Sequence, residues 1–420
     1  MNLSQWLDYQ QSIHPKSIEL GLDRVRDVAQ RMGLRKPAPR VITVAGTNGK
    51  GSTVAFIEAM ARAAGYSVGA YTSPHLVRYN ERVRIDGKDA VDAALVAAFE
   101  AVEAARGDIS LTYFEFGTLA ALWLFARAPL DLAILEVGMG GRLDAVNIVD
   151  GDVAIVTTVA LDHVETLGPD RETIAREKAG IFRAGKPAVI AEIDPPDTLL
   201  READHVGAVT VRAGRSYRYE TSSTGWVWSD DGDAIALPAP GLEAPAQQAN
   251  AAAAIAALRA LVPALPVPDA ALVQGVANAR LAGRMQRIDG PVEIVLDVAH
   301  NPQAAQQLAL WLQRHRVRGA TLAVFAGLAD KDVANEVAAL MGRIDIWHLA
   351  GLNGQGSRGQ TVDVLWAKIG SLLSRSLVIR HEDVAHALAE ARRTAQAGDR
   401  IVVFGSFHTV GEVLAALDAG

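Results

Sequence analysis

The stretch VAGTNGKGST, Val44–Thr53, joins an apolar run at residues 41–45 to a helical pattern that extends from Ser52 to Ala64. Its three glycines let the backbone curl, so that successive N–H groups can face an anion. The positive end of the helix dipole and the ammonium group of Lys50 add to that potential. The stretch therefore predicts a phosphate-binding loop between a buried strand and a helix.

This loop differs from the common phosphate-loop pattern G-x-x-x-x-G-K-[ST]. Gly46 and Gly49 are three residues apart, and Gly51 follows Lys50 where a hydroxyl group is expected. A flexible turn with an incidental lysine is the alternative interpretation. We favour the phosphate loop because strand, glycines, lysine, hydroxyl and helix follow one another in the required order.

The composition limits the classes of protein to consider. The chain has 420 residues, 50% hydrophobic and 21% charged, which supports large cores and two to three domains. The formal net charge is −7, so we expect no general binding of nucleic acid. Cysteine is absent, which excludes disulfides, thiolate catalysis and cysteine-bound metal clusters. Without a signal-peptide pattern or a run of 18 apolar residues, we expect a cytoplasmic protein that binds no membrane.

Short β-branched runs alternate with alanine-rich helical patterns in the first half of the chain. The runs at residues 132–137, 153–159 and 187–190 continue the series that begins at 41–45. Such alternation is typical of βαβ units and predicts a doubly wound, mostly parallel sheet.

Aromatic residues at spacing two mark a different region after about residue 205. Tyr217 and Tyr219 form one such pair, Trp226 and Trp228 form another, and a Ser-Asp-Asp-Gly-Asp turn follows. This pattern predicts a β-hairpin or a small meander at the edge of the first domain.

A second series of strands and helices starts near residue 292. Its strand-like runs are VEIVLDV, TLAVFAG, IDIWHLA, LVIRH and RIVVFGSF. We place the domain boundary near Gln286–Gly290 and expect an α/β protein. Residues 1–287 are predicted to form an N-terminal P-loop-type domain with a mostly parallel sheet and a small β subregion. Residues 288–420 are predicted to form a C-terminal Rossmann-like α/β domain.

Three polar residues stand where strands end, beside the predicted phosphate loop: Ser73, Glu136 and His163. The carboxyl ends of parallel strands face one crevice of an open sheet. Hydroxyl and carboxylate oxygens suit Mg²⁺, whereas imidazole is a less usual ligand of that ion. Taken singly, the three residues also fit a turn cap, a salt-bridge partner and a core histidine. Taken together, they favour a metal site.

The second half of the chain carries further motifs with polar side chains. LDVAHNP places Asp297 and His300 at the end of a strand, and AGRMQ places Arg284 just before the domain boundary. GSFHTV places Ser406 and His408 after the last strand. A guanidinium suits phosphate neutralisation. Strand-end and helix caps explain these motifs equally well, so the residues alone leave both interpretations open.

Nine motifs occur in one order along the chain: VAGTNGKGST, TSPHLVRYNERVRI, FEFGTLAALWLF, LEVGMGGRLDAVN, LDHVETLG, REKAGIFR, GRMQ, LDVAHNP and GSFHTV. In this order they resemble the bifunctional dihydrofolate synthase/folylpolyglutamate synthase family of bacteria, which is related to the Mur ligases. The resemblance runs from about residue 6 to about residue 415, and several of the motifs are long and specific.

This resemblance implies a carbon–nitrogen ligase. The family joins the amine of L-glutamate to the carboxylate of dihydropteroate, which gives dihydrofolate, and to the γ-carboxylate of folates, which lengthens a polyglutamate tail. ATP converts the carboxylate into an acyl phosphate, and the amine then displaces phosphate. The implied cofactor is Mg²⁺, with two ions bound, and a monovalent cation is a further candidate. We expect a monomer that binds ATP, dihydropteroate, reduced folates and L-glutamate.

The resemblance also implies roles for residues of this chain. Lys178 matches a lysine that is carboxylated in the family, and His300 lies next to the nucleotide site, so these are the expected catalytic residues. The expected metal ligands are Ser73, Glu136 and His163. The expected ATP contacts are Thr47, Asn48, Gly49, Lys50, Gly51, Ser52, Asn250, Arg284 and Asp297. The expected pterin contacts are Ser12, Ile13, His14, Pro15, Thr112, Tyr113, Phe114, Glu115, Leu143, Asp144 and Ala145, and the expected glutamate contact is Ser406.

Other functions explain the sequence less well. A GTPase would need an N-K-x-D base-reading motif, and the nearest string, Asp330-Lys331-Asp332, does not supply it. A non-catalytic folate- or nucleotide-binding protein would not need the metal residues together with Lys178. A peptidoglycan ligase of the Mur type is the nearest alternative enzyme, but it does not account for the pterin motifs.

Overall fold

The computed structural model describes residues 1–420 with the exception of residues 17, 223–224, 355–357 and 419–420. The chain forms two compact units. The first unit comprises residues 1–75, 79–241 and 247–280, and the second comprises residues 76–78, 242–246 and 281–420. The chain therefore passes repeatedly between the units.

The first unit is built on an eight-stranded sheet with the order β4-β3-β2-β5-β1-β6-β7-β8. Six of its strands run parallel, and β3 and β4 extend one edge in antiparallel pairing. This confirms the predicted mostly parallel sheet. The strands are β1 (Arg40–Ala45), β2 (Val68–Tyr71), β3 (Val83–Ile85), β4 (Lys88–Asp89), β5 (Leu132–Glu136), β6 (Val153–Val156), β7 (Pro187–Ile190) and β8 (Val209–Arg212).

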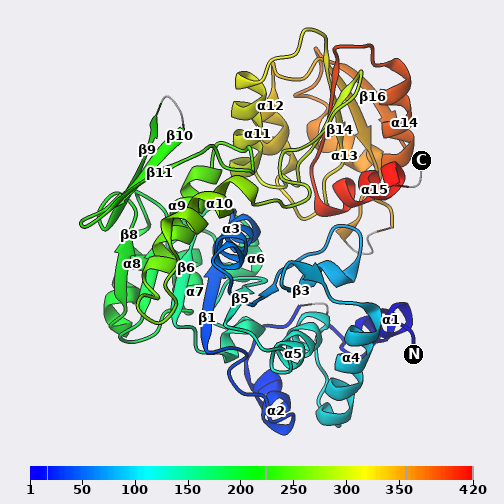
Figure 1. Ribbon diagram of the computed structural model, residues 1–420. Helices are drawn as coiled ribbons and strands as arrows, with labels where there is room; N and C mark the ends of the chain where they lie inside the picture. The colour runs from blue at the N-terminus through cyan, green and yellow to red at the C-terminus, as the bar shows by residue number, and fades with distance from the viewer. Residues whose placement is uncertain (17, 223–224, 355–357, 419–420) are drawn as a thin grey trace. The chain divides into compact units, whose positions relative to one another are not determined.

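Helices flank this sheet, and the central strands are buried on both faces, which explains their nearly continuous apolar sequence. The helix that follows the glycine loop, α3, packs against α9 and α10 (Figure 1). The helices of this unit are α1 (Leu3–Ser12), α2 (Asp23–Arg31), α3 (Lys50–Ala63), α4 (Asp92–Arg106), α5 (Tyr113–Phe125), α6 (Val164–Leu167), α7 (Arg171–Ala179), α8 (Asp197–Val206), α9 (Gln247–Arg259) and α10 (Asp269–Asn278). Two short 3-10 helices, η1 (Tyr79–Arg82) and η2 (Ala145–Ile148), follow β2 and β5.

A small antiparallel sheet of β9 (Tyr217–Ser222), β10 (Gly225–Asp230) and β11 (Ala234–Leu237) belongs to the same unit. The side chains of Trp226 and Trp228 are buried because residues two apart share one face of a strand. The indole N–H of Trp228 donates to the carbonyl oxygen of Ala252 on α9, at 3.2 Å. This confirms the small β subregion.

The second unit has a six-stranded sheet with the order β12-β13-β17-β14-β15-β16. Five strands are parallel, and β12 pairs antiparallel with β13. The strands are β12 (Gln286–Ile288), β13 (Glu293–Leu296), β14 (Thr321–Phe325), β15 (Ile346–Ala350), β16 (Leu377–His381) and β17 (Arg400–Phe404). The helices are α11 (Pro302–Arg314), α12 (Val333–Leu340), α13 (Val362–Ile369), α14 (Val384–Thr394) and α15 (Phe407–Asp418).

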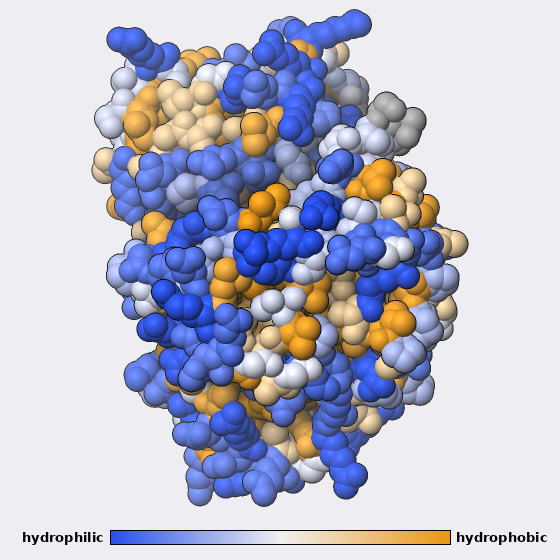
Figure 2. All heavy atoms as spheres, turned by 90° about the vertical axis from the view of Figure 1, so that its left-hand side faces the viewer, coloured by the Kyte–Doolittle hydropathy of each residue, from blue (hydrophilic) through white to orange (hydrophobic). Residues whose placement is uncertain are grey.

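Two apolar clusters cover the two faces of this second sheet, one centred on Trp311, Trp347 and Phe404 and the other on Val324 and Val403. The layered arrangement confirms the expected C-terminal α/β domain. No helix within the described ranges has the length and apolar character needed to cross a membrane. On the face drawn in Figure 2, hydrophobic side chains are interspersed with hydrophilic ones.

Candidate active site

The predicted loop and metal residues follow neighbouring strands of the first sheet. The parallel register aligns Val44 with Glu136 and Ala45 with Val156, and β2 lies on the far side of β5. Ser73 follows β2, the glycine loop follows β1, and His163 follows β6. Glu136 is the last residue of β5. Since the carboxyl ends of parallel strands meet at one edge, the segments after β1, β2, β5 and β6 all start from the same edge of the sheet.

Close packing explains two of the glycines in the loop. Gly46 has φ 151°, and a Cβ atom there would lie 1.8 Å from the hydroxyl oxygen of Thr157. Gly49, the N-cap of α3, has φ 85°, and a Cβ atom there would lie 2.4 Å from Oδ1 of Asn250. The loop can therefore keep this shape only with glycine at both positions.

Threonines that follow β6 hold the loop in place. The backbone N–H of Thr47 donates to the carbonyl oxygen of Thr158 at 2.7 Å, and the N–H of Asn48 donates to the Thr158 hydroxyl at 3.0 Å. The Thr157 hydroxyl donates to the carbonyl oxygen of Asn48 at 2.6 Å. The ammonium group of Lys50 lies within the loop, 3.2 Å from the carbonyl oxygen of Gly46. The loop is thus pre-formed, as a phosphate site requires.

A buried chain of side chains connects α3 with α9. The amide of Gln247 donates to the hydroxyl oxygen of Ser52 at 3.2 Å, and the amide of Asn250 donates to Oε1 of Gln247 at 2.9 Å. All three side chains are buried. The structure thus brings Ser52 and Asn250, both predicted ATP contacts, together through Gln247.

Two of the predicted metal ligands are in direct contact. The backbone N–H of Ser73 donates to Oε2 of Glu136 at 3.2 Å, and the Glu136 side chain is buried. His163 is the N-cap of α6, with φ 50°, and its Nε2 lies 3.9 Å from Oδ2 of Asp162. Among the described residues, no group of three or more His, Asp or Glu side chains is arranged to hold a metal ion by itself.

Two buried ionisable groups have strongly shifted pKa values. Burial, with a contribution from the positive charge of Lys50, lowers the pKa of the Lys178 amine to about 7. Burial also raises the pKa of the Asp144 carboxyl to about 7, although that carboxyl accepts hydrogen bonds from the N–H groups of Met139 and Val146. Shifts of this size are concentrated at functional sites.

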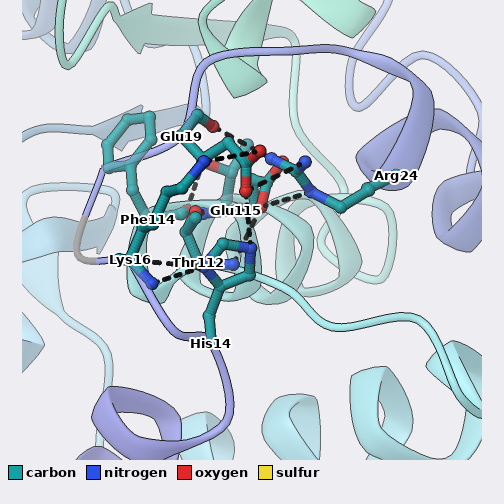
Figure 3. Close-up of polar contacts among 8 residues, drawn as sticks. His14, Lys16, Glu19, Arg24, Thr112, Phe114 and Glu115 are labelled. Atoms are coloured by element: carbon teal, nitrogen blue, oxygen red, sulfur yellow. Dashed lines mark hydrogen bonds and ion pairs between the residues drawn. The ribbon is translucent and has the colours of Figure 1, made fainter.

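The predicted pterin motif at residues 112–115 caps helix α5. The side chain of Thr112 accepts the N–H of Glu115 at 3.2 Å, and Oε2 of Glu115 accepts the N–H of Thr112 at 2.8 Å. From α2, the guanidinium of Arg24 donates to Oε1 of Glu115 at 3.0 Å (Figure 3). This ion pair ties α2 to the start of α5 and thereby fixes the position of Phe114.

A second set of contacts folds the N-terminal segment against the same helix start. Nε2 of His14 lies 3.0 Å from Oε2 of Glu19, and Arg24 lies 3.5 Å from that oxygen (Figure 3). Of the predicted contacts in this segment, His14 is buried and Ile13 half-buried, whereas Ser12 and Pro15 are exposed.

The third predicted pterin motif, residues 143–145, also lies close to these elements. The carbonyl oxygen of Leu143 accepts the N–H of Gly21 at 3.2 Å, and Asp144 caps η2, which begins at Ala145. The ring of Phe114 packs so closely on Gly138 that a Cβ atom there would lie 2.6 Å from it. Three segments that are distant in sequence therefore meet in one region of the first unit.

The predicted residues of the second unit form their own group. Asp297 accepts the N–H groups of Met285 and Ala299 at 2.9 Å each. The guanidinium carbon of Arg284 lies 5.1 Å from the centre of the Phe407 ring, and the His300 ring lies 5.7 Å from the same ring. Phe407 therefore packs beside both predicted side chains.

The hydroxyl of Ser406 has a structural role at the start of α15. It accepts the N–H of Thr409 at 3.0 Å and lies 2.7 Å from the Thr409 hydroxyl, and both residues are buried. These contacts agree with the helix-cap interpretation that the sequence left open.

The sequence did not single out several residues that support the site. Thr157, Thr158, Gln247 and Arg24 each bind a predicted site segment from 90 or more residues away. The paired threonines directly after β6 were a usable signal, because hydroxyl groups at a strand end can bind an adjacent loop. Arg24 and Gln247 lie in ordinary helical patterns and gave no comparable signal.

Two protein families match most of the chain. The family described as Mur ligase middle domain matches residues 44–258, and the family described as Mur ligase, glutamate ligase domain matches residues 283–407. The first match contains the glycine loop and Lys178, and the second contains Asp297 and His300.

Individual relatives cover nearly the whole chain. The dihydrofolate synthase/folylpolyglutamate synthase of Escherichia coli strain K12 is 49% identical over 99% of this chain and 96% of its own length. A solved structure of E. coli FolC in complex with DHPP and ADP has a TM-score of 0.94 and 48% identity, and covers 100% of this chain and 98% of that one. A bifunctional folylpolyglutamate synthase/dihydrofolate synthase from Yersinia pestis, complexed with AMPPNP and Mn ion, has a TM-score of 0.92 and 46% identity, with coverage of 100% and 98%. The chain belongs to the dihydrofolate synthase/folylpolyglutamate synthase family of the Mur ligase superfamily.

Proposed function

We propose that this chain is an ATP-dependent ligase that joins L-glutamate to dihydropteroate, forming dihydrofolate, and to reduced folates, extending a polyglutamate tail. The observation that carries the proposal is the full-length likeness to the E. coli enzyme named for both activities. The pre-formed glycine loop and the shifted pKa values of Asp144 and Lys178 support it independently.

The glycine loop is the proposed site of the ATP phosphates. The N-terminal N–H groups of α3 favour an anion, and the nearest partners of the Lys50 ammonium group are the neutral carbonyl oxygens of Gly46 and Thr47. Its charge is therefore well placed for a phosphate. Thr47–Ser52 and Asn250 are the proposed ATP contacts of the first unit, and Arg284 and Asp297 those of the second.

The donor chemistry near the loop fits a hard divalent cation. The Ser73 hydroxyl and the Glu136 carboxylate are oxygen donors, which Mg²⁺ prefers, and His163 is the less typical third member. These three side chains would leave positions of the shell open, which the phosphate oxygens of ATP and water would fill. A bound Mg²⁺ ion would neutralise charge on the phosphoryl group. The Mn ion named for the Y. pestis relative supports a divalent cation here, and Mg²⁺, two ions and a monovalent cation belong to the proposal.

Lys178 is the proposed site of a carbamate. With a pKa of about 7, much of the buried amine is neutral at physiological pH, and only the neutral amine reacts with CO₂. Its Nζ forms a bond to the carbon of CO₂ and loses a proton to solvent, which leaves an anionic carbamate. The positive charge of Lys50, which contributes to the lowered pKa of Lys178, would favour this anion.

The chemistry follows from these assignments. The substrate carboxylate attacks the γ-phosphorus of ATP, so that an acyl phosphate forms and ADP leaves. The amine of L-glutamate attacks the acyl carbon, loses a proton, and phosphate departs as the amide bond forms. The half-buried aromatic ring of Phe114 would provide a flat surface for the pterin. His300 is proposed to be a catalytic residue beside the nucleotide. Ser406 is proposed to contact the L-glutamate.

An assay with ATP, Mg²⁺ and L-glutamate tests the function when dihydropteroate and tetrahydrofolate are supplied in parallel reactions. Mass spectrometry should show one added glutamyl group on each substrate and one ADP formed per bond. Glu136→Gln should abolish both reactions and keep the fold, whereas Glu100→Gln, at an exposed position of α4, should leave them unchanged. Near-normal turnover by the Glu136 variant would contradict the metal assignment, and an inactive wild type would contradict the function.

A cytoplasmic location and a monomeric state complete the proposal. The absence of cysteine from the sequence agrees with a reducing compartment. Light scattering during gel filtration would test the monomer, and a mass of twice 44.5 kDa would contradict it.

A further inference from the structure

Arg82 is a buried arginine in the first unit that is surrounded by aromatic rings. It is the last residue of η1 and is 8% exposed. Its guanidinium carbon lies 5.4 Å from the centre of the Tyr79 ring and 5.5 Å from the centre of the Tyr113 ring. Its Nε donates to Nδ1 of His75 at 2.8 Å.

Among the residues that the structure describes, no carboxylate forms an ion pair with Arg82. The neighbouring Arg84 shows the usual arrangement, since its guanidinium donates to Glu58 at 2.9 and 3.1 Å. Burial raises the pKa of Tyr79 and of Tyr113, so both phenols are neutral at pH 7 and supply no compensating charge.

This arrangement leaves the positive charge of Arg82 incompletely balanced. Moving a guanidinium out of water costs more free energy than two ring contacts and one neutral hydrogen bond return. Proteins keep buried charges where a partner of opposite sign completes the site. A planar guanidinium matches a carboxylate through two parallel hydrogen bonds.

The surroundings of Arg82 connect it to the proposed substrate site. Tyr113 begins α5 and precedes Phe114, the proposed pterin contact. His75 follows Ser73, whose N–H donates to Glu136. Arg82 therefore contacts Tyr113, which belongs to the predicted pterin segment, and His75, which lies two residues after the proposed metal ligand Ser73.

We propose that Arg82, whose guanidinium lies beside the rings of Tyr79 and Tyr113, binds a carboxylate group of a substrate. This rests on the proposed function, whose substrates other than ATP each carry a carboxylate. Three sources have that chemistry: the carboxylate that becomes activated, the α-carboxylate of the terminal glutamyl group of a folate, and a carboxylate of the incoming L-glutamate.

Steady-state kinetics of Arg82→Gln and Arg82→Lys test the proposal, with dihydropteroate, tetrahydrofolate and L-glutamate varied in separate experiments. Loss of a charge-assisted pair should raise the affected KM by roughly 10- to 100-fold in the Gln variant and by less in the Lys variant. The KM for ATP should stay the same. If Arg82 only stabilised the fold, its replacement would lower the stability of the protein but would not raise the KM of one substrate selectively.

The pattern of KM values identifies the carboxylate. A rise for dihydropteroate and tetrahydrofolate together indicates the carboxylate that is activated. A rise for tetrahydrofolate alone indicates the α-carboxylate of its glutamyl group, and a rise for L-glutamate alone indicates the incoming amino acid. Unchanged KM values for all three substrates would overturn the proposal.

Arg84→Gln is the matched control, because it removes a half-buried guanidinium that already has an acid partner. It should lower the thermal midpoint without changing any KM. If Arg82→Gln does not fold, Arg82→Lys decides, since it keeps the charge and loses only the planar fork. A wild type that adds no glutamate at all would contradict the proposed function itself, whereas an active wild type with unaffected Arg82 variants would contradict only this site.

Discussion

Lys178 is the residue in which burial has the clearest chemical consequence. A lysine at the surface is protonated at neutral pH and does not react with CO₂, because its lone pair is occupied. The environment of Lys178 lowers its pKa to about 7, chiefly by burial and further by Lys50. Its position near the end of α7 therefore gives the chain a nucleophilic amine that no motif other than REKAGIF indicates.

Lys178→Ala should lose most of the ligase activity, because no carbamate can form on alanine. Short carboxylates such as acetate or propionate should restore part of it by occupying the vacated space. Initial rates with and without added carboxylate measure the effect, and Lys186→Ala, at an exposed site, serves as the control. Full activity of the unsupplemented Lys178 variant would show that the carbamate is irrelevant.

Asp144 allows a prediction about stability and pH. Its folded-state pKa is raised from 3.8 to about 7, so between these values the folded protein holds a proton that the unfolded chain has released. Stability from this group is therefore lost as the pH rises from about 4 to about 7. Asn cannot ionise, so the Asp144→Asn variant avoids this loss. Its free energy of unfolding minus that of the wild type should therefore be larger, meaning a relatively more stable variant, at pH 8 than at pH 5.

Urea unfolding of both proteins at the two pH values measures this difference. Lys178 also titrates near neutrality, but it is present in both proteins and cancels in the comparison. A difference that does not change between pH 5 and pH 8 would show that Asp144 is ionised throughout.

The glycine loop shows how an element depends on contacts with its neighbours. Gly46→Ala would place a Cβ atom 1.8 Å from the Thr157 hydroxyl and force the loop away from β6. Strain of this kind costs about 1–3 kcal/mol. We expect ADP binding, measured by calorimetry, to weaken at least about tenfold.

Gly232→Ala is the control for that variant, because a Cβ atom there meets only the Asp230 carboxylate at 3.8 Å. It should bind ADP like wild type. Unchanged affinity of the Gly46 variant would contradict the phosphate-loop assignment.

The link between α2 and α5 is a second relation between elements that bears on the site. Arg24→Gln removes the partner of the buried Glu115 carboxylate and frees the start of α5, so the KM for dihydropteroate should rise several-fold while the KM for ATP stays constant. Arg26→Gln, on the exposed side of the same helix, should change neither value. Equal kinetics of the two variants would show that the ion pair does not position the pterin segment.

Much of the fold was predictable from the sequence because the central strands are buried on both faces and have continuous apolar runs. Strand β8 was missed because its side chains are half exposed at a sheet edge, and β12 because it has only three residues. Contacts such as Arg24 with Glu115 join residues 91 positions apart. Local patterns carry no information about such pairs, so supporting residues such as Arg24 and Gln247 emerged only from the structure.

At the scale of the whole molecule, each unit takes residues from distant parts of the chain. The side chain of Ala244 packs against one apolar cluster of the second unit, and that of Leu76 packs against the other. Met285, which precedes β12, is buried in the first of these clusters. The predicted boundary after residue 287 would separate all three side chains from the core that they help to cover.

A fragment of residues 288–420 should therefore be less stable than a fragment of residues 281–420, which keeps Met285 and the whole of β12. Thermal unfolding followed by circular dichroism compares the two, and we expect the shorter fragment to have a lower midpoint by several degrees. Equal midpoints would support a boundary after residue 287.

Lys178 and Asp144, both under the influence of Lys50, have a final consequence for nucleotide binding. Because two groups here titrate near neutrality, the net charge of this region can change when a charged ligand binds. A polyanion that enters such a region draws protons from the solution, and the buffer must release them. The heat measured when the protein takes up a nucleotide at pH 7 should therefore depend on the ionisation enthalpy of the buffer, so that titrations in phosphate and in Tris would report different enthalpies for one and the same event.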